Sequence, residues 1–130
     1  MKPRVLVVDD DPELAMMVRD VLQKGGFETW VAEPLHAERV FEAKPFDLLI
    51  TDKNMPGLSG YELIGQLRGR YPHLPVVMMS AYPELTGANT PIQGYLAKPF
   101  SSVKTIIDVA RRTIDLAQRL AEVRKWKLAG

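Results

Sequence analysis

The chain has 130 residues, of which 46% are hydrophobic and 25% charged, a composition typical of a globular domain and not of a disordered segment. It contains no cysteine, which excludes a disulfide scaffold, a thiolate metal site and a cysteine nucleophile. The net charge is only +1, and no apolar run suits a membrane span or signal peptide, so we expect a cytoplasmic domain that binds neither nucleic acid nor membrane.

A buried strand and a capped helix open the chain. Residues 5–8 form a continuous apolar run, which is typical of a strand buried on both faces. Asp11 suits the N-cap of the following helix and Pro12 its first position. Apolar residues then recur at helical spacing until residues 25–26, both glycine, where we expect the helix to end. Residues 27–31 predict the second strand.

Another helix, a strand and a third helix follow. Residues 34–44 predict a weak helix, and residues 47–51 predict a buried strand that ends at Asp52. After a Met-Pro-Gly turn, Ser59 and Glu62 match a capping box at the start of the third helix.

Two short strands and a long helix complete the predicted elements. Residues 75–79 predict the fourth strand, which ends at Ser80, and residues 95–97 predict a fifth, which ends at Lys98. Apolar residues at helical spacing predict one last helix over residues 102–126.

This order of elements predicts an α/β domain: a doubly wound, five-stranded parallel sheet with helices on both faces. In such a sheet the functional groups lie at the carboxyl ends of the strands. The residues that follow the predicted strands are Asp9, Asp10, Asp52, Ser80 and Lys98. We therefore expect three acids, one hydroxyl and one amine to meet at one edge.

Taken singly, these residues have ordinary interpretations as helix caps, turn residues or solvated charges. Together they suggest a metal site and phosphoryl transfer. Three neighbouring carboxylates raise one another's pKa unless a cation is present, and an oxygen-only cluster suits Mg2+. An ion beside Asp52 could bridge phosphoryl oxygens while Ser80 and Lys98 hold the others, which makes Asp52 the candidate nucleophile.

Three segments carry a resemblance to a known family: VLVVDD at residues 5–10, DLLITDKNMPG at 47–57 and GYLAKPF at 94–100. They resemble the receiver domains of two-component response regulators, and the resemblance covers nearly the whole chain. It implies a flavodoxin-like sheet in the order 2-1-3-4-5. It also implies a signalling switch, not a turnover enzyme, that takes a phosphoryl group from a histidine kinase or phosphotransfer protein.

The resemblance also implies a role for each matching residue. Asp52 is the phosphoacceptor, and Mg2+ is bound by Asp10, Asp52 and the backbone carbonyl of Asn54, with Asp9 acting through a water.

Four further positions match the family's phosphoryl-binding and switching residues. Lys98 pairs with the phosphoryl group, and Ser80 moves toward it. Tyr95 matches the aromatic residue whose rotamer reports phosphorylation. The resemblance further implies a cis peptide bond before Pro99.

The segment over residues 81–93 departs from the family pattern. Receivers place an amphipathic helix there, whereas Pro83, Gly87 and Pro91 interrupt this sequence and leave too few apolar residues for a stripe. We predict one or two distorted turns or a mobile loop. In the family this helix forms part of the face used for homodimers and partners, so we expect that face to differ here.

The last helix is longer than the sheet requires and carries a second apolar stripe. That stripe consists of Leu116, Leu120 and Val123. It is explained either by a solvated tail or by a helix that contacts a partner or leads into an output domain. We assign residues 1–117 to the receiver domain and 118–130 to a helical extension. Its excess of basic residues is typical of a solvated face, and we do not assign it to nucleic-acid binding.

Three other functions share parts of this pattern. A haloacid-dehalogenase-like phosphatase needs a second Asp two residues after its nucleophile, where this chain has Asn54. A flavodoxin-like cofactor binder needs a phosphate loop after the first strand, and carboxylates there repel phosphate. A pseudo-receiver, which docks partners without phosphorylation, remains the alternative to the switch.

Overall fold

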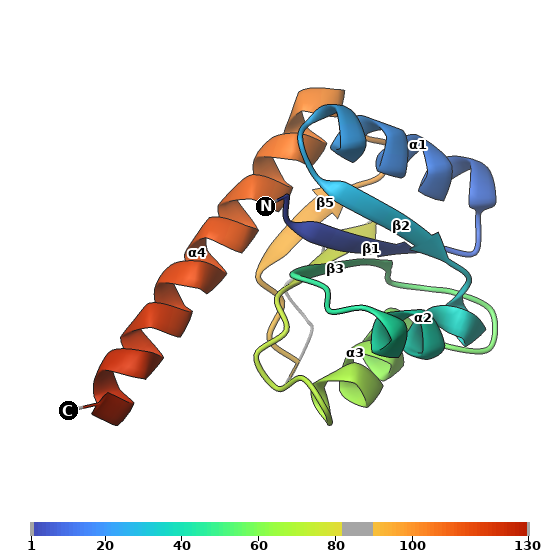
Figure 1. Cartoon of the computed structure of the whole chain (residues 1–130). Helices are drawn as coiled ribbons and strands as arrows, with labels where there is room; N and C mark the ends of the chain where they lie inside the picture. The colour runs from blue at the N-terminus through green and yellow to red at the C-terminus, as the bar shows by residue number, and fades with distance from the viewer. Residues whose placement is uncertain (1, 82–89, 130) are drawn as a thin grey trace.

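The computed structural model describes residues 2–81 and 90–129, and its centre is a five-stranded parallel sheet (Figure 1). The strand order is β2-β1-β3-β4-β5, which confirms the predicted doubly wound, flavodoxin-like sheet. The strands are β1 (Arg4–Val8), β2 (Glu28–Ala32), β3 (Leu48–Asp52), β4 (Val76–Ser80) and β5 (Gly94–Ala97).

Three strands, β2, β3 and β4, extend one residue beyond their predicted ends, and in β3 and β4 that residue is polar. Asp52 is the last residue of β3 and pairs in register with Met79, while Ser80 is the last residue of β4 and pairs with Ala97. Backbone pairing thus includes the polar residue at which the apolar run stops. As a result, Asp52 and Ser80 are held by the sheet itself and not by a loop.

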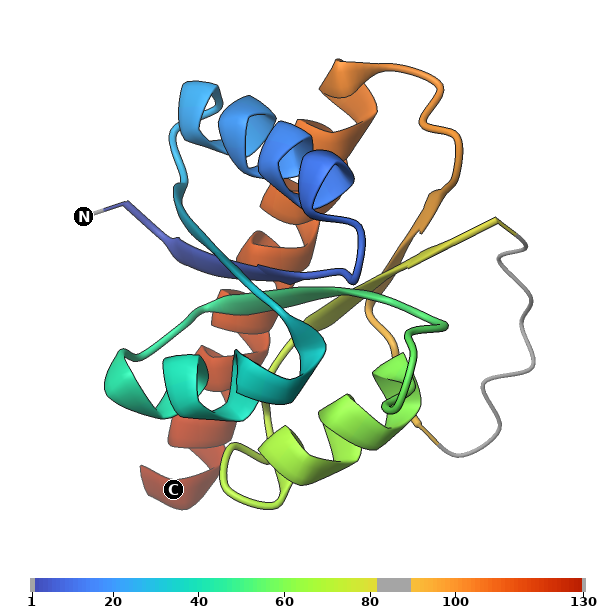
Figure 2. The same cartoon turned by 90° about the vertical axis from the view of Figure 1, so that its right-hand side faces the viewer.

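Helices cover both faces of the sheet, as predicted. They are α1 (Pro12–Lys24), the short 3-10 helix η1 (Pro34–His36), α2 (Ala37–Ala43), α3 (Gly60–Arg68) and α4 (Val103–Ala129). Figure 1 shows α1 and α4 against one face and α2 and α3 against the other, and Figure 2 shows α4 running behind the strands. The helix predicted over 34–44 is divided between η1 and α2, and neither segment has a side-chain cap at its start.

The side chains of the central strands alternate between two cores. Val5 and Val7 of β1 pack in the core beneath α1 and α4, whereas Leu6 and Val8 pack in the core beneath α2 and α3. All four are fully buried, because both faces of a parallel sheet are covered by helices. This packing holds the carboxyl ends of β1, β3 and β4 in fixed relative positions.

Side-chain caps begin the helices that follow the functional edge. Asp11 accepts hydrogen bonds from the first amides of α1. Ser59 and Glu62 form the predicted capping box at α3, with bonds of 3.1 and 3.2 Å. Ser102 caps α4 by accepting from the amide of Thr105. The starts of these helices are therefore set by local sequence.

Loss of the α3 cap is expected to destabilise the protein. Ser59→Ala removes the acceptor for the Glu62 amide and should lower the free energy of unfolding by about 1 kcal/mol. Urea unfolding measures the change. Ser101→Ala is the matched control, because among the described residues the Ser101 hydroxyl is hydrogen-bonded only to that of Thr105, at 3.4 Å. Equal losses in the two variants would contradict the capping role.

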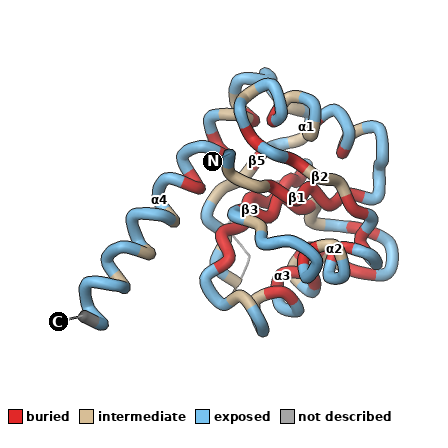
Figure 3. Tube along the Cα trace, in the orientation of Figure 1, coloured by how far each residue is buried: buried red, intermediate tan, exposed pale blue. Residues whose placement is uncertain are grey.

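The last helix continues beyond the sheet. Over residues 103–128, Ile114 is the last one buried. From there the helix leaves the body of the protein (Figure 1) with a largely exposed surface (Figure 3). We call residues 115–128 the α4 overhang. The predicted single helix is confirmed, and it ends at Ala129, three residues later than expected.

Two further expectations concern helices. Between β4 and β5, residues 81 and 90–93 are not helical, and the rest of the distorted segment predicted over 81–93 lies outside the described residues. None of the helices within the described ranges combines the length and hydrophobicity needed to cross a bilayer.

Candidate phosphoryl and metal site

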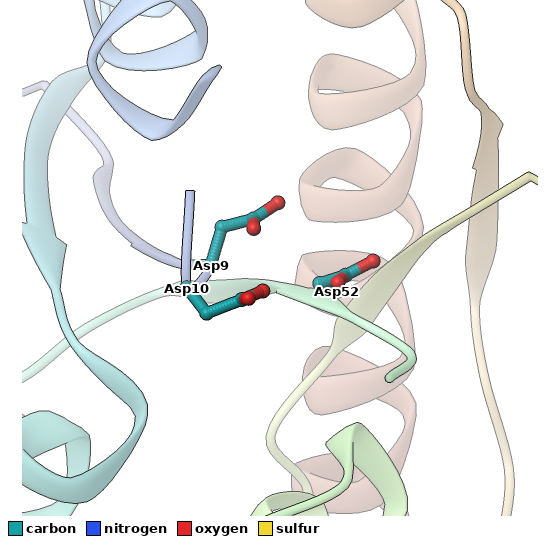
Figure 4. A group of neighbouring side chains, drawn as sticks. All are labelled: Asp9, Asp10 and Asp52. Carbon is teal, nitrogen blue, oxygen red and sulfur yellow. The ribbon is translucent and has the colours of Figure 1, made fainter. Parts of the chain in front are cut away.

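Three carboxylates meet at the carboxyl edge of the sheet. Asp9 and Asp10 follow β1, and Asp52 ends the neighbouring strand β3, so that the parallel pairing of Val8 with Thr51 places them side by side. One carboxylate oxygen from each residue lies within 4.8 Å of the other two. Figure 4 shows the Asp9 and Asp10 side chains extending toward Asp52.

A lysine that follows the edge strand β5 neutralises part of this charge. The Nζ atom of Lys98, just after β5, lies 2.8 Å from Oδ2 of Asp9 and 3.1 Å from Oδ1 of Asp52. The Lys98 amide donates to the carbonyl of Ser80 at 2.8 Å, which ties the start of this segment to β4. The other Asp9 oxygen accepts from the amide of Asp11. The buried Asp9 carboxylate is thus fully engaged, whereas Asp10 is exposed.

The electrostatics of the cluster favour a further cation. Burial raises the pKa of Asp52, the negative charge of Asp9 adds to this, and the hydrogen bond from Lys98 offsets only part of it. Burial acts to lower the pKa of Lys98, but its hydrogen bonds and ion pairs with Asp9 and Asp52 outweigh burial and raise it. One ammonium is therefore shared by two carboxylates, and ionisation of Asp52 remains unfavourable in the folded protein.

The raised pKa of Asp52 gives the stability a definite pH dependence. Below the ordinary value of 3.8, Asp52 is protonated in both the folded and the unfolded chain. As the pH rises above it, the unfolded chain ionises first, so the folded state loses stability relative to it. Asp52→Asn removes this loss.

In metal-free buffer the Asp52→Asn variant should therefore be more stable than the wild type at pH 7. Its advantage should disappear as the pH falls below 3.8, the ordinary pKa. Urea unfolding across this range measures the difference. Asp108→Asn, at an exposed carboxylate of α4, is the control. An advantage for Asp52→Asn that does not change with pH would contradict the electrostatic origin.

Comparison with known proteins identifies this arrangement. The family model described as the response regulator receiver domain matches residues 5–111. The chain belongs to this family. Among its relatives, the receiver domain is 39% identical over 117 residues to the response regulator protein FleR of Pseudomonas aeruginosa, a match that covers 86% of this chain and 24% of FleR.

Other relatives and solved structures agree with this assignment. The receiver domain is 32% identical over 133 residues to the DNA-binding transcriptional regulator NtrC of Escherichia coli, covering 97% of this chain and 28% of NtrC. The chain thus spans about a quarter of the length of these curated relatives. The chemotaxis response regulator CheY4 of Vibrio cholerae superposes with a TM-score of 0.80 at 28% identity, covering 87% of this chain and 99% of CheY4. NtrX of Brucella abortus gives 0.86 at 27% identity, covering 97% of this chain and 30% of NtrX.

The remaining predicted residues lie at the ends of, on or just after the strands of the sheet. Ser80 is buried at the end of β4, next to the strand that carries Asp52. Tyr95 lies half-buried on β5 and packs on the core beneath α2 and α3. Asn54 is exposed two residues after Asp52. The peptide bond before Pro99 is cis, the isomer that the resemblance implies.

Sequence reasoning missed the part that Gly60 plays beside Asp52. The Gly60 amide donates to the carbonyl of Lys53 at 2.9 Å. A Cβ atom on Gly60 would lie 2.4 Å from the carbonyl oxygen of Asp52, which is closer than a carbon and a non-bonded oxygen can approach. The absence of a side chain therefore lets the first turn of α3 rest on the Asp52 backbone. The only signal in the sequence is a glycine directly after the Ser59 cap.

Proposed function

We propose that this receiver domain is a phosphorylation-dependent switch of a two-component system. In this proposal Asp52 accepts a phosphoryl group from a phosphohistidine of a histidine kinase or phosphotransfer protein, in a Mg2+-dependent reaction in the cytoplasm. The observation that carries the proposal is the setting of Asp52, whose carboxylate lies beside two other carboxylates and 3.1 Å from the Lys98 ammonium.

The proposed transfer is a single displacement at phosphorus. A carboxylate oxygen of Asp52 forms the new O–P bond while the P–N bond of the phosphohistidine breaks, and the departing imidazole keeps the electron pair and takes a proton from solvent. The Lys98 ammonium stabilises negative charge on the phosphoryl oxygens, and the Ser80 hydroxyl at the neighbouring strand end is the further proposed donor.

The donor set fits a magnesium ion. Asp9, Asp10 and Asp52 offer only oxygen atoms, and their separation of at most 4.8 Å suits a hard cation. We propose that Asp10, Asp52 and the backbone carbonyl of Asn54 bind Mg2+ directly, with Asp9 acting through a water. Bound there, the ion would neutralise charge on the transferred group.

The proposed output is a conformational switch and not repeated hydrolysis. Ser80 and Tyr95 are the proposed switch residues. Ser80 ends β4, the strand that pairs with the Asp52 strand β3, and Tyr95 lies on β5, which pairs with β4. Asn54 occupies the position where an acid would promote hydrolysis of the acyl phosphate. The adduct on Asp52 should therefore last long enough to carry a signal.

Intact-protein mass measurement after incubation with acetyl phosphate tests the proposal. The wild type should gain one phosphoryl group with Mg2+ and none with EDTA, and Asp52→Asn should gain none. Asp11→Asn is the matched control, since it changes an acid next to the cluster but keeps a capping side chain. A folded wild type that forms no adduct would favour the pseudo-receiver instead.

We also propose that residues 1–117 form the receiver domain and residues 118–130 a helical extension. Support comes from burial, since Ile114 is the last buried residue of α4. A chain that ends at residue 117 should keep the wild-type free energy of unfolding to within about 1 kcal/mol, because few apolar atoms are lost from the core. Urea unfolding checks this, and a larger loss would show that the extension belongs to the domain.

A further inference from the structure

The α4 overhang presents an apolar stripe to solvent. Leu116, Leu120 and Val123 are each about half exposed, at 49%, 49% and 52%. Their spacings of four and three residues place them on one face of the helix. Trp126, three residues further, is 83% exposed. Figure 3 shows this part of α4 as exposed helix that stands apart from the sheet.

The stripe continues into a pocket beneath the helix. Leu116 and Leu120 form one wall of a pocket of about 290 Å3. The opposite walls come from residues 72–75, which lead into β4, and from Pro91 and Gln93, which precede β5. The pocket therefore lies at the amino-terminal edge of the sheet, opposite the carboxylate cluster. It is large enough to receive one large apolar side chain.

The charged groups that line this pocket share one sign. Arg68 and Arg124 line the pocket together with His73, and no carboxylate belongs to its described lining. The Arg68 guanidinium is held by neutral acceptors, among them the Leu74 carbonyl at 2.9 Å and the Gln93 side chain at 3.0 Å. Within the described residues no carboxylate forms an ion pair with it.

The helix itself repeats this pattern. Three or four residues from each stripe residue, where side chains on a helix are neighbours, the only charged residues are basic. They are Arg112, Arg119, Arg124 and Lys127. Within the described part of the chain none of these four forms an ion pair. The stripe is thus an apolar seam between unpaired cations.

We propose that the α4 overhang and its pocket are a docking surface for an acidic amphipathic helix of a partner protein. The partner helix would place apolar side chains at i, i+4 and i+7 against the stripe, with one of them in the pocket. Glu or Asp residues beside them would meet Arg119, Arg124 and Lys127. This inference goes beyond the proposed phosphorylation and does not depend on it.

Charge and shape favour this occupant over the alternatives. A parallel pair of α4 helices joined along the stripe would bring Arg119 of one copy against Arg124 of the other, which is repulsive. Nucleic acid offers no apolar row to match the stripe. A flat bilayer would leave the concave pocket unfilled. An acidic amphipathic helix would cover the apolar stripe, pair with the cations and place a side chain in the pocket.

Fluorescence anisotropy with designed peptides tests the proposal on the full chain. The probe is a labelled helical peptide of about 20 residues with Leu at i, i+4 and i+7 and Glu at the flanking positions. A second peptide carries Lys in place of every Glu. We expect the Glu peptide to bind, more weakly as salt is raised, and the Lys peptide not to bind.

Variants locate the binding. Leu120→Ser and Arg119→Glu should each weaken binding of the Glu peptide by about tenfold or more. Lys125→Glu makes the same charge change on the opposite side of the helix and should alter binding by less than about twofold. Leu35→Ser, at an exposed leucine of η1, is the matched apolar control. Asp52→Asn should bind like the wild type, which separates this proposal from the phosphorylation.

Several results would overturn the proposal. One is no binding of the Glu peptide at about 1 mM. Another is an equal loss of Glu-peptide affinity in Arg119→Glu and Lys125→Glu, which would show that only the overall charge of the protein matters. A dimer that Leu120→Ser dissociates in sedimentation would assign the stripe to a second copy. Tighter binding to phosphatidylserine vesicles than to the peptide would assign it to a membrane.

Discussion

Lys98→Met is expected to lower the free energy of unfolding of the metal-free protein by about 3 kcal/mol. The lysine holds two carboxylates, at 2.8 Å from Asp9 and 3.1 Å from Asp52. The side chains of these acids are only 1% and 13% exposed, so water cannot replace the ammonium fully. Methionine keeps most of the apolar stem of the lysine side chain and removes its ammonium, with both the positive charge and the hydrogen-bond donors.

Urea unfolding in EDTA at pH 7 measures this loss, and two comparisons identify its cause. Lys104→Met, at an exposed lysine of α4, should change stability by less than about 0.5 kcal/mol. Saturating Mg2+ should narrow the gap between Lys98→Met and the wild type, because the ion then supplies the missing positive charge. A gap that persists unchanged in Mg2+ would mean that lost packing, and not lost charge, causes the instability.

Gly60→Ala and Gly65→Ala, two identical changes in α3, are expected to have opposite signs. At Gly60 the new methyl group would meet the Asp52 carbonyl at 2.4 Å and the Met78 side chain at 3.2 Å, and the forced shift should cost about 1–3 kcal/mol. At Gly65 nothing lies within 4 Å, so alanine should stabilise the helix by about 0.5–1 kcal/mol.

Thermal and urea unfolding compare the two alanine variants directly. Because the shift at Gly60 moves the backbone of the proposed phosphoacceptor, Gly60→Ala should also form the acetyl phosphate adduct more slowly, whereas Gly65→Ala should match the wild type. If Gly60→Ala proved as stable as the wild type, the close approach of α3 to Asp52 would not constrain the protein.

The architecture could be predicted because its signals are local and repeated. The apolar runs of β1, β3 and β4 are continuous, as expected for strands covered on both faces, and the caps at Asp11 and Ser59 are short-range patterns. The ends of β3 and β4 were predicted one residue too early, because the apolar run stops there before the backbone pairing does. Asp52 and Ser80 are polar, yet both still pair within the sheet.

The sequence predicted which acids lie together at this edge, but not the contacts that Lys98 and Gly60 make with them. Parallel topology alone brings Asp9, Asp10 and Asp52 to one edge, so their proximity followed from the order of the strands. That Lys98 reaches both Asp9 and Asp52 depends on the distance across β4, which sequence does not encode locally. The close approach of Gly60 likewise depends on how α3 packs on β3, a contact between elements and not within one.

The two tryptophans give this protein separate optical reporters. Trp30 of β2 lies 5.7 Å from the ring of Phe46, and its ring faces Lys44 at 4.4 Å. Trp126 stands in the α4 overhang, almost fully in water. Its emission should therefore be quenched by iodide in the free protein and protected when the overhang is covered. Neither indole adjoins the carboxylate cluster, so binding of a cation there should leave this fluorescence nearly unchanged.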